Sequence, residues 1–366
     1  SVHIVVTDAD LNASVGAADT ATVTVATDTE TAGGVSESVT LTETGADTGV
    51  FRGSIALSVG GSAASDGTLA AAVGDTVTLT YQDAADDWGA SVTVSSSATL
   101  VGTIVVGSIG NTTWSVSASP YLIIGDVTVL SNTTLTIEPG VRVLFLAGTD
   151  LLQSGDFSDR AELIVNGTLN AEAATSTNPI VFTSSASTPA ARDWGTIRFN
   201  SGAGGSLKHC EINAASYGIY TYGNNANPTI DSCAISNNSI YGIYVDNYSA
   251  PTISNSTISS NSGNGIFIYN YSAPTITNSL ISSNSGGGIY GNWGQGDVTI
   301  ASSTISDNSG WGVYANRPTG DFIISNSIIS NNFGHGMYYE NAQSGASLSV
   351  SDSTVSNNSG TGIYLE

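Results

Sequence analysis

A motif of about two dozen residues recurs from residue 105 onward, and no other feature limits the possible fold so strongly. The motif has the form xIxxSxIxxN, in which x is any residue. Its first aliphatic residue recurs every 23 to 26 residues, at Ile230, Ile253, Ile276, Ile300, Ile324 and Val350. A second aliphatic residue follows five positions later, from Ile235 to Val355. A unit of this length without a helical period is one coil of a solenoid, whose strands stack on those of the coil before. The repeat therefore predicts a β-solenoid of roughly ten coils.

Each repeat reaches an asparagine shortly after its second aliphatic residue. The equivalent positions are Asn238, Asn261, Asn284, Asn308, Asn332 and Asn358. Asparagine tolerates the left-handed backbone that a sharp turn needs, and stacked amides can hydrogen-bond from one coil to the next. We expect these six side chains to form an asparagine ladder at a tight turn.

The first 104 residues follow a different pattern. Alternating runs such as "ATVTVAT", "SVTLTET" and "TVTLTY" are separated by turn signals such as "ETGADTG" and "VGGSAASDG". Short alternating strands with frequent turns are typical of a β-sandwich. We therefore predict two domains, a sandwich at residues 1–104 and a solenoid at residues 105–366.

The repeat resembles that of the right-handed parallel β-helix family, which includes pectate lyases, polygalacturonases and non-enzymatic surface proteins of bacteria and archaea. The resemblance covers about residues 105–366, and "SPYLIIGDVTVLSNTTLTIEPGVRVLF" is similar to the opening coils of such proteins. "VTDADLN" and "VTLTETGADTGVFRG" are similar to the immunoglobulin-like or adhesin-like sandwich modules of prokaryotic surface proteins. The resemblance implies an all-β chain, with an N-terminal β-sandwich followed by a right-handed parallel β-helix of roughly ten coils. It also implies an extracellular or cell-surface location.

The charge of the chain excludes several partners. Thirty Asp and Glu face seven Lys and Arg, which gives a net charge of -23. This charge repels a phosphate backbone and anionic membranes. No stretch is long or apolar enough to span a membrane. We therefore expect neither nucleic acid as a partner nor membrane insertion.

Catalysis by enzymes of this fold class requires acidic groups gathered on one face, because glycosidic cleavage uses paired carboxylates. Within residues 201–366 no such pair is evident, since Asp246 and Glu340 share a coil position but lie four coils apart. "GHG" at residues 334–336 matches a short polygalacturonase signature, but its glycines belong to the repeat. The sequence therefore predicts no catalytic residues and a protein that is not an enzyme.

An aromatic residue follows the repeat glycine in a "GIY" motif. The seven positions are Tyr220, Tyr244, Phe267, Tyr290, Tyr314, Tyr338 and Tyr364. Strand alternation turns these rings outward, so we predict an exposed stripe that binds a partner. A second copy of the chain in a homopolymer, another surface protein and a polysaccharide all fit such a stripe. The alternative is that the rings stack on one another and only stiffen the fold.

Two smaller groups of residues have the pattern of special sites. Asp8, Asp10, Asn12 and Asp19 have the alternating oxygen ligands of a Ca²⁺ loop, although acids that merely form turns give the same pattern. Cys210 and Cys233 occupy one position in neighbouring coils, where parallel strands give poor disulfide geometry. We expect a calcium site at the first group and unbridged, stacked thiols at the second.

Together these features predict a non-enzymatic extracellular structural or adhesive protein. The last coil, "GIYLE", has no cap after it, which favours head-to-tail self-assembly into filaments. The alternative is a β-helix that binds or degrades polysaccharide.

Overall fold

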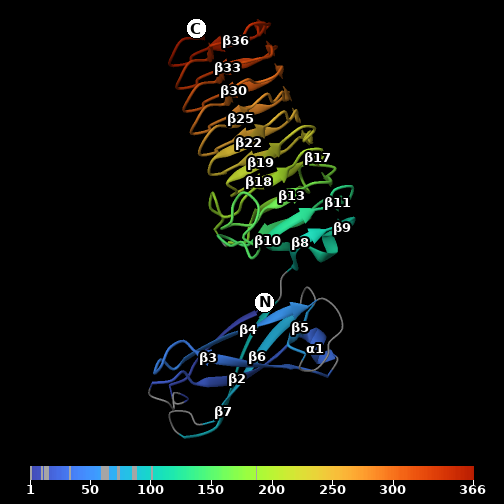
Figure 1. Ribbon diagram of the computed structural model, residues 1–366, viewed down its shortest axis with the longest axis vertical. Coiled ribbons are helices and arrows are strands. Elements are labelled where there is room, and N and C mark those ends of the chain that lie inside the picture. The colour runs from blue at the N-terminus through green and yellow to red at the C-terminus, as the bar shows by residue number, and fades with distance from the viewer. Residues whose placement is uncertain are drawn as a thin grey trace. The chain divides into compact units, whose positions relative to one another are not determined.

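The computed structural model describes residues 2–9, 11, 16–32, 34–58, 66–71, 75–84, 89–99, 102–186 and 188–366, and the regular secondary structure of these residues is almost wholly strand (Figure 1). The chain divides into two compact units, residues 1–103 and residues 104–366.

The N-terminal unit is built on one sheet with the strand order β1, β4, β3, β2, β6, β7, with β5 paired to β4. Its elements are β1 (Val2–Thr7), β2 (Thr20–Ala26), α1 (Asp28–Ala32), β3 (Glu37–Glu43), β4 (Val50–Ser58), β5 (Thr68–Ala70), β6 (Thr76–Asp83) and β7 (Val92–Thr99). Side chains along β2 and β3 alternate between buried and exposed, and Leu41, Phe51 and Leu69 are fully buried. The described strands form one hydrogen-bonded path, so the two-sheet sandwich stays a prediction.

The second unit is a β-helix whose coils stack one on another in Figure 1. It begins with β8 (Thr103–Ile109) and a short 3-10 helix, Val116–Ala118. Each later coil contributes one strand to each of three sheets, and strands of successive coils pair in parallel.

The first sheet carries the "GIY" motifs. Its strands are β10 (Tyr121–Val129), β13 (Leu163–Val165), β16 (Ile197–Phe199), β19 (Tyr217–Tyr222), β22 (Tyr241–Asp246), β25 (Ile266–Tyr269), β28 (Ile289–Asn292), β31 (Val313–Asn316), β34 (Met337–Glu340) and β37 (Ile363–Leu365).

The second sheet precedes the first in each coil. Its strands are β12 (Arg142–Phe145), β15 (Ile180–Ser184), β18 (Cys210–Asn213), β21 (Ala234–Ser236), β24 (Thr257–Ser259), β27 (Leu280–Ser282), β30 (Thr304–Ser306), β33 (Ile328–Ser330) and β36 (Thr354–Ser356).

The third sheet has 10 strands. They are β9 (Thr112–Trp114), β11 (Thr134–Ile137), β14 (Thr168–Glu172), β17 (Gly204–Lys208), β20 (Thr229–Asp231), β23 (Thr252–Ser254), β26 (Thr275–Thr277), β29 (Val298–Ala301), β32 (Phe322–Ser325) and β35 (Leu348–Ser351).

The core of the β-helix consists of the repeat aliphatics, stacked in register. Ile253 pairs with Ile230 before it and Ile276 after it, and Ile258 is placed likewise between Ile235 and Ile281. All six side chains are fully buried. Each such side chain contributes roughly 1.5–3 kcal/mol by leaving water. The predicted solenoid and its number of coils are confirmed.

The six repeat asparagines stand in one column, and each amide reaches the next coil. Asn261 donates through Nδ2 to Oδ1 of Asn284 at 2.9 Å, and this bond recurs along the column. The expectation about the backbone was wrong by one position. The left-handed residue is the one before each asparagine, such as Ser260 (φ 57°) or Asp307 (φ 58°). The asparagine is required for its amide, because Nδ2 also donates to a backbone carbonyl of the preceding coil.

Cys210 and Cys233 are buried, free thiols. They begin a column of small residues that continues through Ser256 and Ser279. The backbone N–H of Cys233 donates to Oγ of Ser256 at 3.1 Å, and that of Ser256 donates to Oγ of Ser279 at 3.2 Å. The column therefore links consecutive coils by hydrogen bonds.

Among the described residues, no helix has the length and apolar character needed to cross a membrane.

Candidate functional site

The seven predicted aromatic residues lie on the outer side of the first sheet and form an aromatic ladder. Successive ring centroids are 4.5 to 5.3 Å apart. Most neighbouring rings are close to parallel, as for Tyr220 and Tyr244 at 5°. Phe267 is the exception, because it crosses Tyr244 at 66° and stacks instead on Tyr241 at 3°. Each coil thus places its ring against that of its neighbours.

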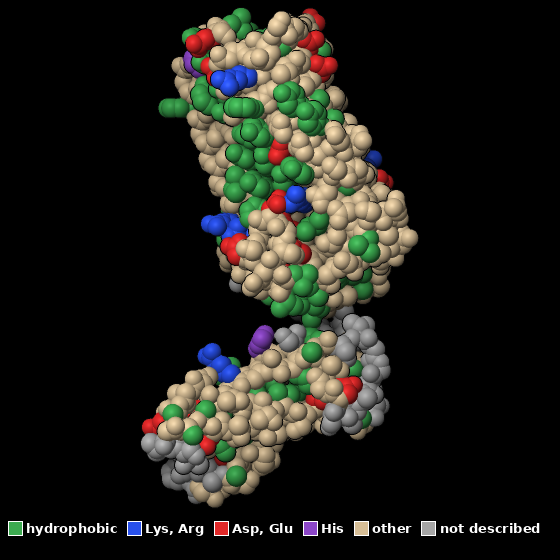
Figure 2. Space-filling model, viewed as in Figure 1, with side chains coloured by type: hydrophobic (Ala, Val, Ile, Leu, Met, Phe, Trp, Pro, Cys, Tyr) green, Lys and Arg blue, Asp and Glu red, His purple; other side chains and the backbone are tan. Residues whose placement is uncertain are grey.

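The rings are less exposed than the sequence suggested, and the predicted exposed stripe needs correction. Tyr220 and Tyr314 are only 7% and 8% exposed, and Tyr364, in the last coil, is 38% exposed. Ring faces are covered by the rings of adjacent coils, so mainly edges and hydroxyl groups remain at the surface. Figure 2 shows hydrophobic side chains gathered along the β-helix.

Charged groups lie at the N-terminal end of the ladder. Arg198 occupies the ladder position in β16, where it pairs in register with Tyr220. Its guanidinium lies 5.3 Å from the ring centroids of both Tyr220 and Tyr222, and it forms an ion pair with Asp156. A cation over aromatic rings is stabilised by their quadrupoles.

Asp246 is a second carboxylate at the N-terminal end of the ladder, and this residue is 7% exposed. Its Oδ2 accepts hydrogen bonds from the hydroxyls of Tyr220 at 3.4 Å and Tyr244 at 3.2 Å. Its Oδ1 is buried without a hydrogen-bond partner. Burial raises the pKa of the Asp246 carboxyl, and burial and the nearby carboxylate raise the pKa of both phenols. Titratable groups perturbed in this way are frequent at functional sites.

A second group of carboxylates gathers beside the ladder, around the segment between β12 and β13. Asp126 Oδ1 accepts from the backbone N–H of Glu162 at 2.8 Å, and Asp150 Oδ1 accepts from that of Asp126 at 3.2 Å. Glu162 Oε2 accepts from the backbone N–H of Asp156 at 2.6 Å. Burial, with a further contribution from neighbouring Asp126, raises the pKa of Glu162 to about 8.

The segment between β12 and β13 closes the N-terminal end of the aromatic ladder. The ring of Phe157 lies 5.4 Å from that of Tyr217, and Arg160 donates to Oγ of Ser216 at 3.2 Å. These acids precede residue 201, outside the range in which the sequence shows no carboxylate pair, so this group was not predicted. The acids at residues 150, 156 and 162 belong to one segment, and the stacking of coils brings Asp126, from β10, against them.

A second set of aromatic residues lies at the turn between the first and third sheets. We call Tyr248, Tyr271, Trp293 and Arg317 the turn column. Its three rings are 50%, 46% and 58% exposed, in that order. Tyr248 stacks on Tyr271 at 5.0 Å, and the Arg317 guanidinium lies 5.4 Å from the Trp293 ring. The duplicated "NYSAP" at residues 247 and 270 was the sequence signal for this column.

His335, from the "GHG" triplet, has a structural contact. Its Nδ1 accepts from the backbone N–H of Thr361 at 2.9 Å, and its ring lies 5.4 Å from those of Tyr338 and Tyr364. Among the described residues, no carboxylate forms a hydrogen bond with the His335 ring.

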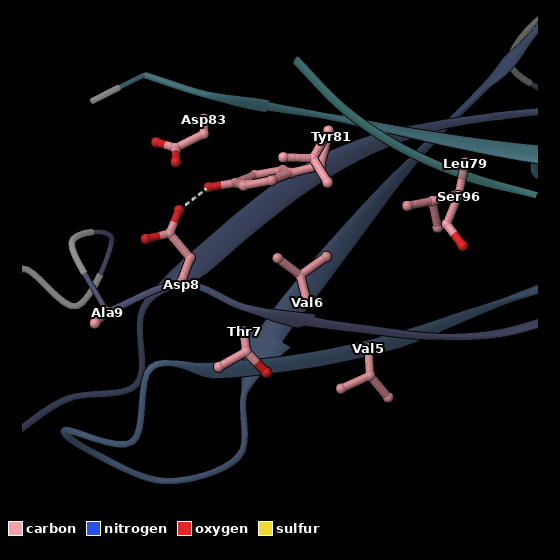
Figure 3. Close-up of a pocket in the computed structure, with 10 residues that line it drawn as sticks. Val5, Val6, Thr7, Asp8, Ala9, Leu79, Tyr81, Asp83 and Ser96 are labelled. Carbon is pink, nitrogen blue, oxygen red and sulfur yellow. Dashed lines mark hydrogen bonds between the residues drawn. The ribbon is translucent and has the colours of Figure 1, made fainter. Parts of the chain in front are cut away.

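The predicted calcium residues are only partly within the described chain. Asp10 and Asn12 lie outside the described residues. Asp8 accepts a hydrogen bond from the Tyr81 hydroxyl at 2.5 Å, in a pocket of about 380 Å³ that Asp83 also lines (Figure 3). The backbone N–H of Asp19 donates to Glu43 Oε2 at 3.1 Å. Among the described residues, no group of three or more His, Cys, Asp or Glu is placed to hold a metal ion, and calcium stays a prediction.

Comparison with known families identifies the repeat region. The model of the family described as "Right handed beta helix region" matches residues 173–295 and 217–366, which together make up more than half of the 366 residues. No curated protein matches the chain.

Several solved structures are similar in the course of the backbone. The periplasmic alginate epimerase AlgG matches with 10% identity and a TM-score of 0.32, over 67% of this chain and 69% of its own. Pectate lyase Pel9A matches with 16% identity and a TM-score of 0.33, over 70% and 79%. The Streptococcus pneumoniae surface protein and adhesin PfbA matches with 10% identity and a TM-score of 0.28, over 73% and 92%.

The prediction that the protein is not an enzyme needs correction, because its premise does not hold. Clustered carboxylates, which the prediction took to be missing, lie around Glu162. The lack of an acid pair in residues 201–366 therefore does not exclude catalysis.

Proposed function

This chain belongs to the right-handed β-helix family, and we propose that it is an extracellular protein that binds a polysaccharide lengthwise along its first sheet. The supporting observation is the outer surface of that sheet, where a column of ring edges and a column of mainly polar groups run side by side along successive coils.

Two parallel columns make up this surface. Beside the aromatic ladder runs a mainly polar column, two residues further along each strand. Its members are Asn200, Tyr222, Asp246, Tyr269, Asn292, Asn316, Glu340 and Glu366. A sugar ring has apolar C–H faces and a rim of hydroxyls, so it matches a surface of ring edges, phenol hydroxyls, amides and carboxylates.

The N-terminal end of this surface gives the proposed binding a direction. Arg198 is a basic side chain at this end of the surface, whereas the members of the two columns are neutral or acidic. Tyr222, beside it, is 37% exposed and the side chain of Arg198 is 16% exposed, so a bound chain contacts Tyr222 and the accessible part of Arg198. We expect the end of the polysaccharide nearest Arg198 to be held most tightly, since its guanidinium donates charge-assisted hydrogen bonds to sugar oxygens.

Binding assays with a panel of neutral and acidic polysaccharides test this function. We expect one class to bind and the Arg198→Ala and Tyr222→Ala variants to bind it about tenfold more weakly, the loss of roughly 1.4 kcal/mol. Thr275→Ala, on the exposed side of the third sheet, is the matched control and should bind normally. If folded wild-type protein retains none of the polysaccharides, the proposal is wrong.

Turnover of the bound polysaccharide is the second candidate function. It is favoured by Asp246, a buried carboxyl of raised pKa that accepts hydrogen bonds from two phenols, one of which, Tyr220, lies under the Arg198 guanidinium. A carboxyl with a raised pKa keeps its proton to higher pH than an ordinary carboxyl, which suits a general acid. We expect Asp246→Asn to abolish product formation and to retain binding, as measured by chromatography of the reaction products. Equal product formation by variant and wild type would remove Asp246 from the mechanism.

Cell-surface adhesion and self-association are the remaining parts of the proposal. The chain has few basic residues and a net charge of -23. Both features support a secreted protein. A second copy of the chain is the proposed protein partner, and light scattering over a range of concentrations tests it. A mass that stays monomeric at the highest concentration would exclude the homopolymer.

A further inference from the structure

The turn column borders a groove that is separate from the aromatic ladder. The groove has a volume of about 550 Å³, and it is lined by Asn270, Tyr271, Trp293, Arg317, Thr319 and Gln343, among others. No acidic side chain lines it, although the chain has 30 Asp and Glu. Among the ion pairs of the described residues, none involves Arg317.

Two of the five residues at this turn are not those that the backbone prefers. Equivalent positions in five successive coils have left-handed φ angles, namely Asn247 (55°), Asn270 (50°), Trp293 (57°), Arg317 (53°) and Asn341 (54°). Asparagine fits this conformation at little cost, whereas a bulky side chain is strained in it. Three coils have asparagine, and two have tryptophan and arginine instead. Backbone preference therefore does not explain why Trp293 and Arg317 stand there, and residues held in strained backbone conformations cluster at functional sites.

The packing around the groove keeps its rings in place and accessible. A Cβ on Gly294 would lie 3.1 Å from Cε1 of Tyr271, so the glycine provides the space in which that ring lies. Tyr248 stacks against the same ring at 5.0 Å, and Arg317 lies over Trp293. Fixed aromatic rings that remain half exposed, with amides and an arginine around them, suit a flat ligand with many oxygen atoms.

We propose that this groove is a saccharide subsite in which a sugar ring packs on Trp293 and Tyr271. Arg317, Asn270 and Gln343 donate hydrogen bonds to the oxygens of that sugar. This subsite rests on the proposed function, because it holds a further part of the same polysaccharide. It takes sugar hydroxyls or a sugar carboxylate, since a guanidinium binds both.

The variants Trp293→Asn and Arg317→Asn test the subsite, because each introduces the residue that neighbouring coils already have. We expect about a tenfold loss of affinity for the polysaccharide in each variant and a melting temperature equal to or above that of the wild type. Phe333→Asn is the matched control, since Phe333 is 76% exposed and lies outside the groove. Its affinity should equal that of the wild type.

The results separate the subsite from the proposed function. If Arg198→Ala weakens binding and neither groove variant does, the subsite is wrong and the lengthwise site stands. If the groove variants weaken binding and Arg198→Ala does not, the subsite stands without the lengthwise site. If the wild type retains no polysaccharide, a mixture of short neutral and carboxylated oligosaccharides is titrated while tryptophan fluorescence is recorded. A change that is present in wild type and lost in Trp293→Asn supports the subsite, and no change in the wild type overturns it.

The same titration identifies the ligand class. A neutral oligosaccharide bound independently of salt indicates recognition of hydroxyls. A carboxylated one whose affinity falls with salt, and falls further in Arg317→Asn, indicates an ion pair with Arg317.

Discussion

The aromatic ladder and the turn column are both made of rings on successive coils, yet their surroundings differ. In the ladder every described coil from β19 onward supplies a ring, so each ring covers its neighbours, and Tyr314 is only 8% exposed. In the turn column the rings occur in three coils only, and Trp293 is 58% exposed. An unbroken column thus favours stability, whereas an interrupted column leaves rings accessible to a ligand.

The largest expected effect of a substitution concerns a covered ring of the ladder. Tyr314→Ala removes a ring that stacks on Tyr290 at 4.5 Å and on Trp311 at 4.8 Å. We expect a loss of about 4 kcal/mol in the free energy of unfolding, as for other buried aromatic residues. Urea denaturation measures it. A loss below about 1 kcal/mol would contradict the view that the ladder is structural.

The asparagine ladder is a second structural column, and the effect of a substitution in it can be compared with that in the aromatic ladder. Asn284→Ala removes the amide that accepts from Asn261 and donates to Asn308, both at 2.9 Å. Because several buried groups then lose partners, we expect a loss of about 3 kcal/mol in the same measurement. A variant as stable as the wild type would show that water replaces the amide.

Glu162 makes the closed end of the aromatic ladder sensitive to pH. Its carboxyl has a pKa of about 8 in the folded chain against 4.5 when exposed, so the folded state holds the proton more tightly. Stability from this group is therefore complete below about pH 4.5 and declines as the pH rises to about 8. We expect a decline on the order of 2 kcal/mol, since relaxation of the segment reduces the full value.

Glu162→Gln should remove this decline, because the amide stays neutral at every pH. Denaturation curves of wild type and variant at pH 5 and pH 8 give the comparison. Parallel pH profiles of the two proteins would contradict the assignment to Glu162. Binding in the turn groove, several coils away, should not change between the two proteins.

The smallest expected effect lies in the turn column. Trp293→Asn replaces a strained residue with one that accepts φ near 57°. We expect stability to stay equal or to rise by about 1 kcal/mol, in contrast to the loss in the ladder. Thermal denaturation measures the change. A loss of more than about 2 kcal/mol would mean that Trp293 serves the fold, and the distinction between the two columns would fail.

Prediction from sequence succeeded where one residue type recurs in every coil. Ile253, Asn261 and Tyr338 each have the same residue type above and below, so the repeat length already gives their contacts. It failed where the repeat is broken. The segment that carries Asp156 and Phe157 has no counterpart in other coils, and the pairing of Asp156 with Arg198 follows from the folded chain alone.

The sequence by itself determined the coil, its inward aliphatic residues and the columns in which like residues stack, because a fixed repeat places equivalent residues one strand spacing apart. The tertiary structure decided which aromatic rings are covered, which carboxylates meet around Glu162 and where a groove opens. These depend on what lies against a side chain from neighbouring coils and from the segments between strands. The burial of a side chain and the charges around it depend on these neighbours, and the sequence pattern alone does not give them.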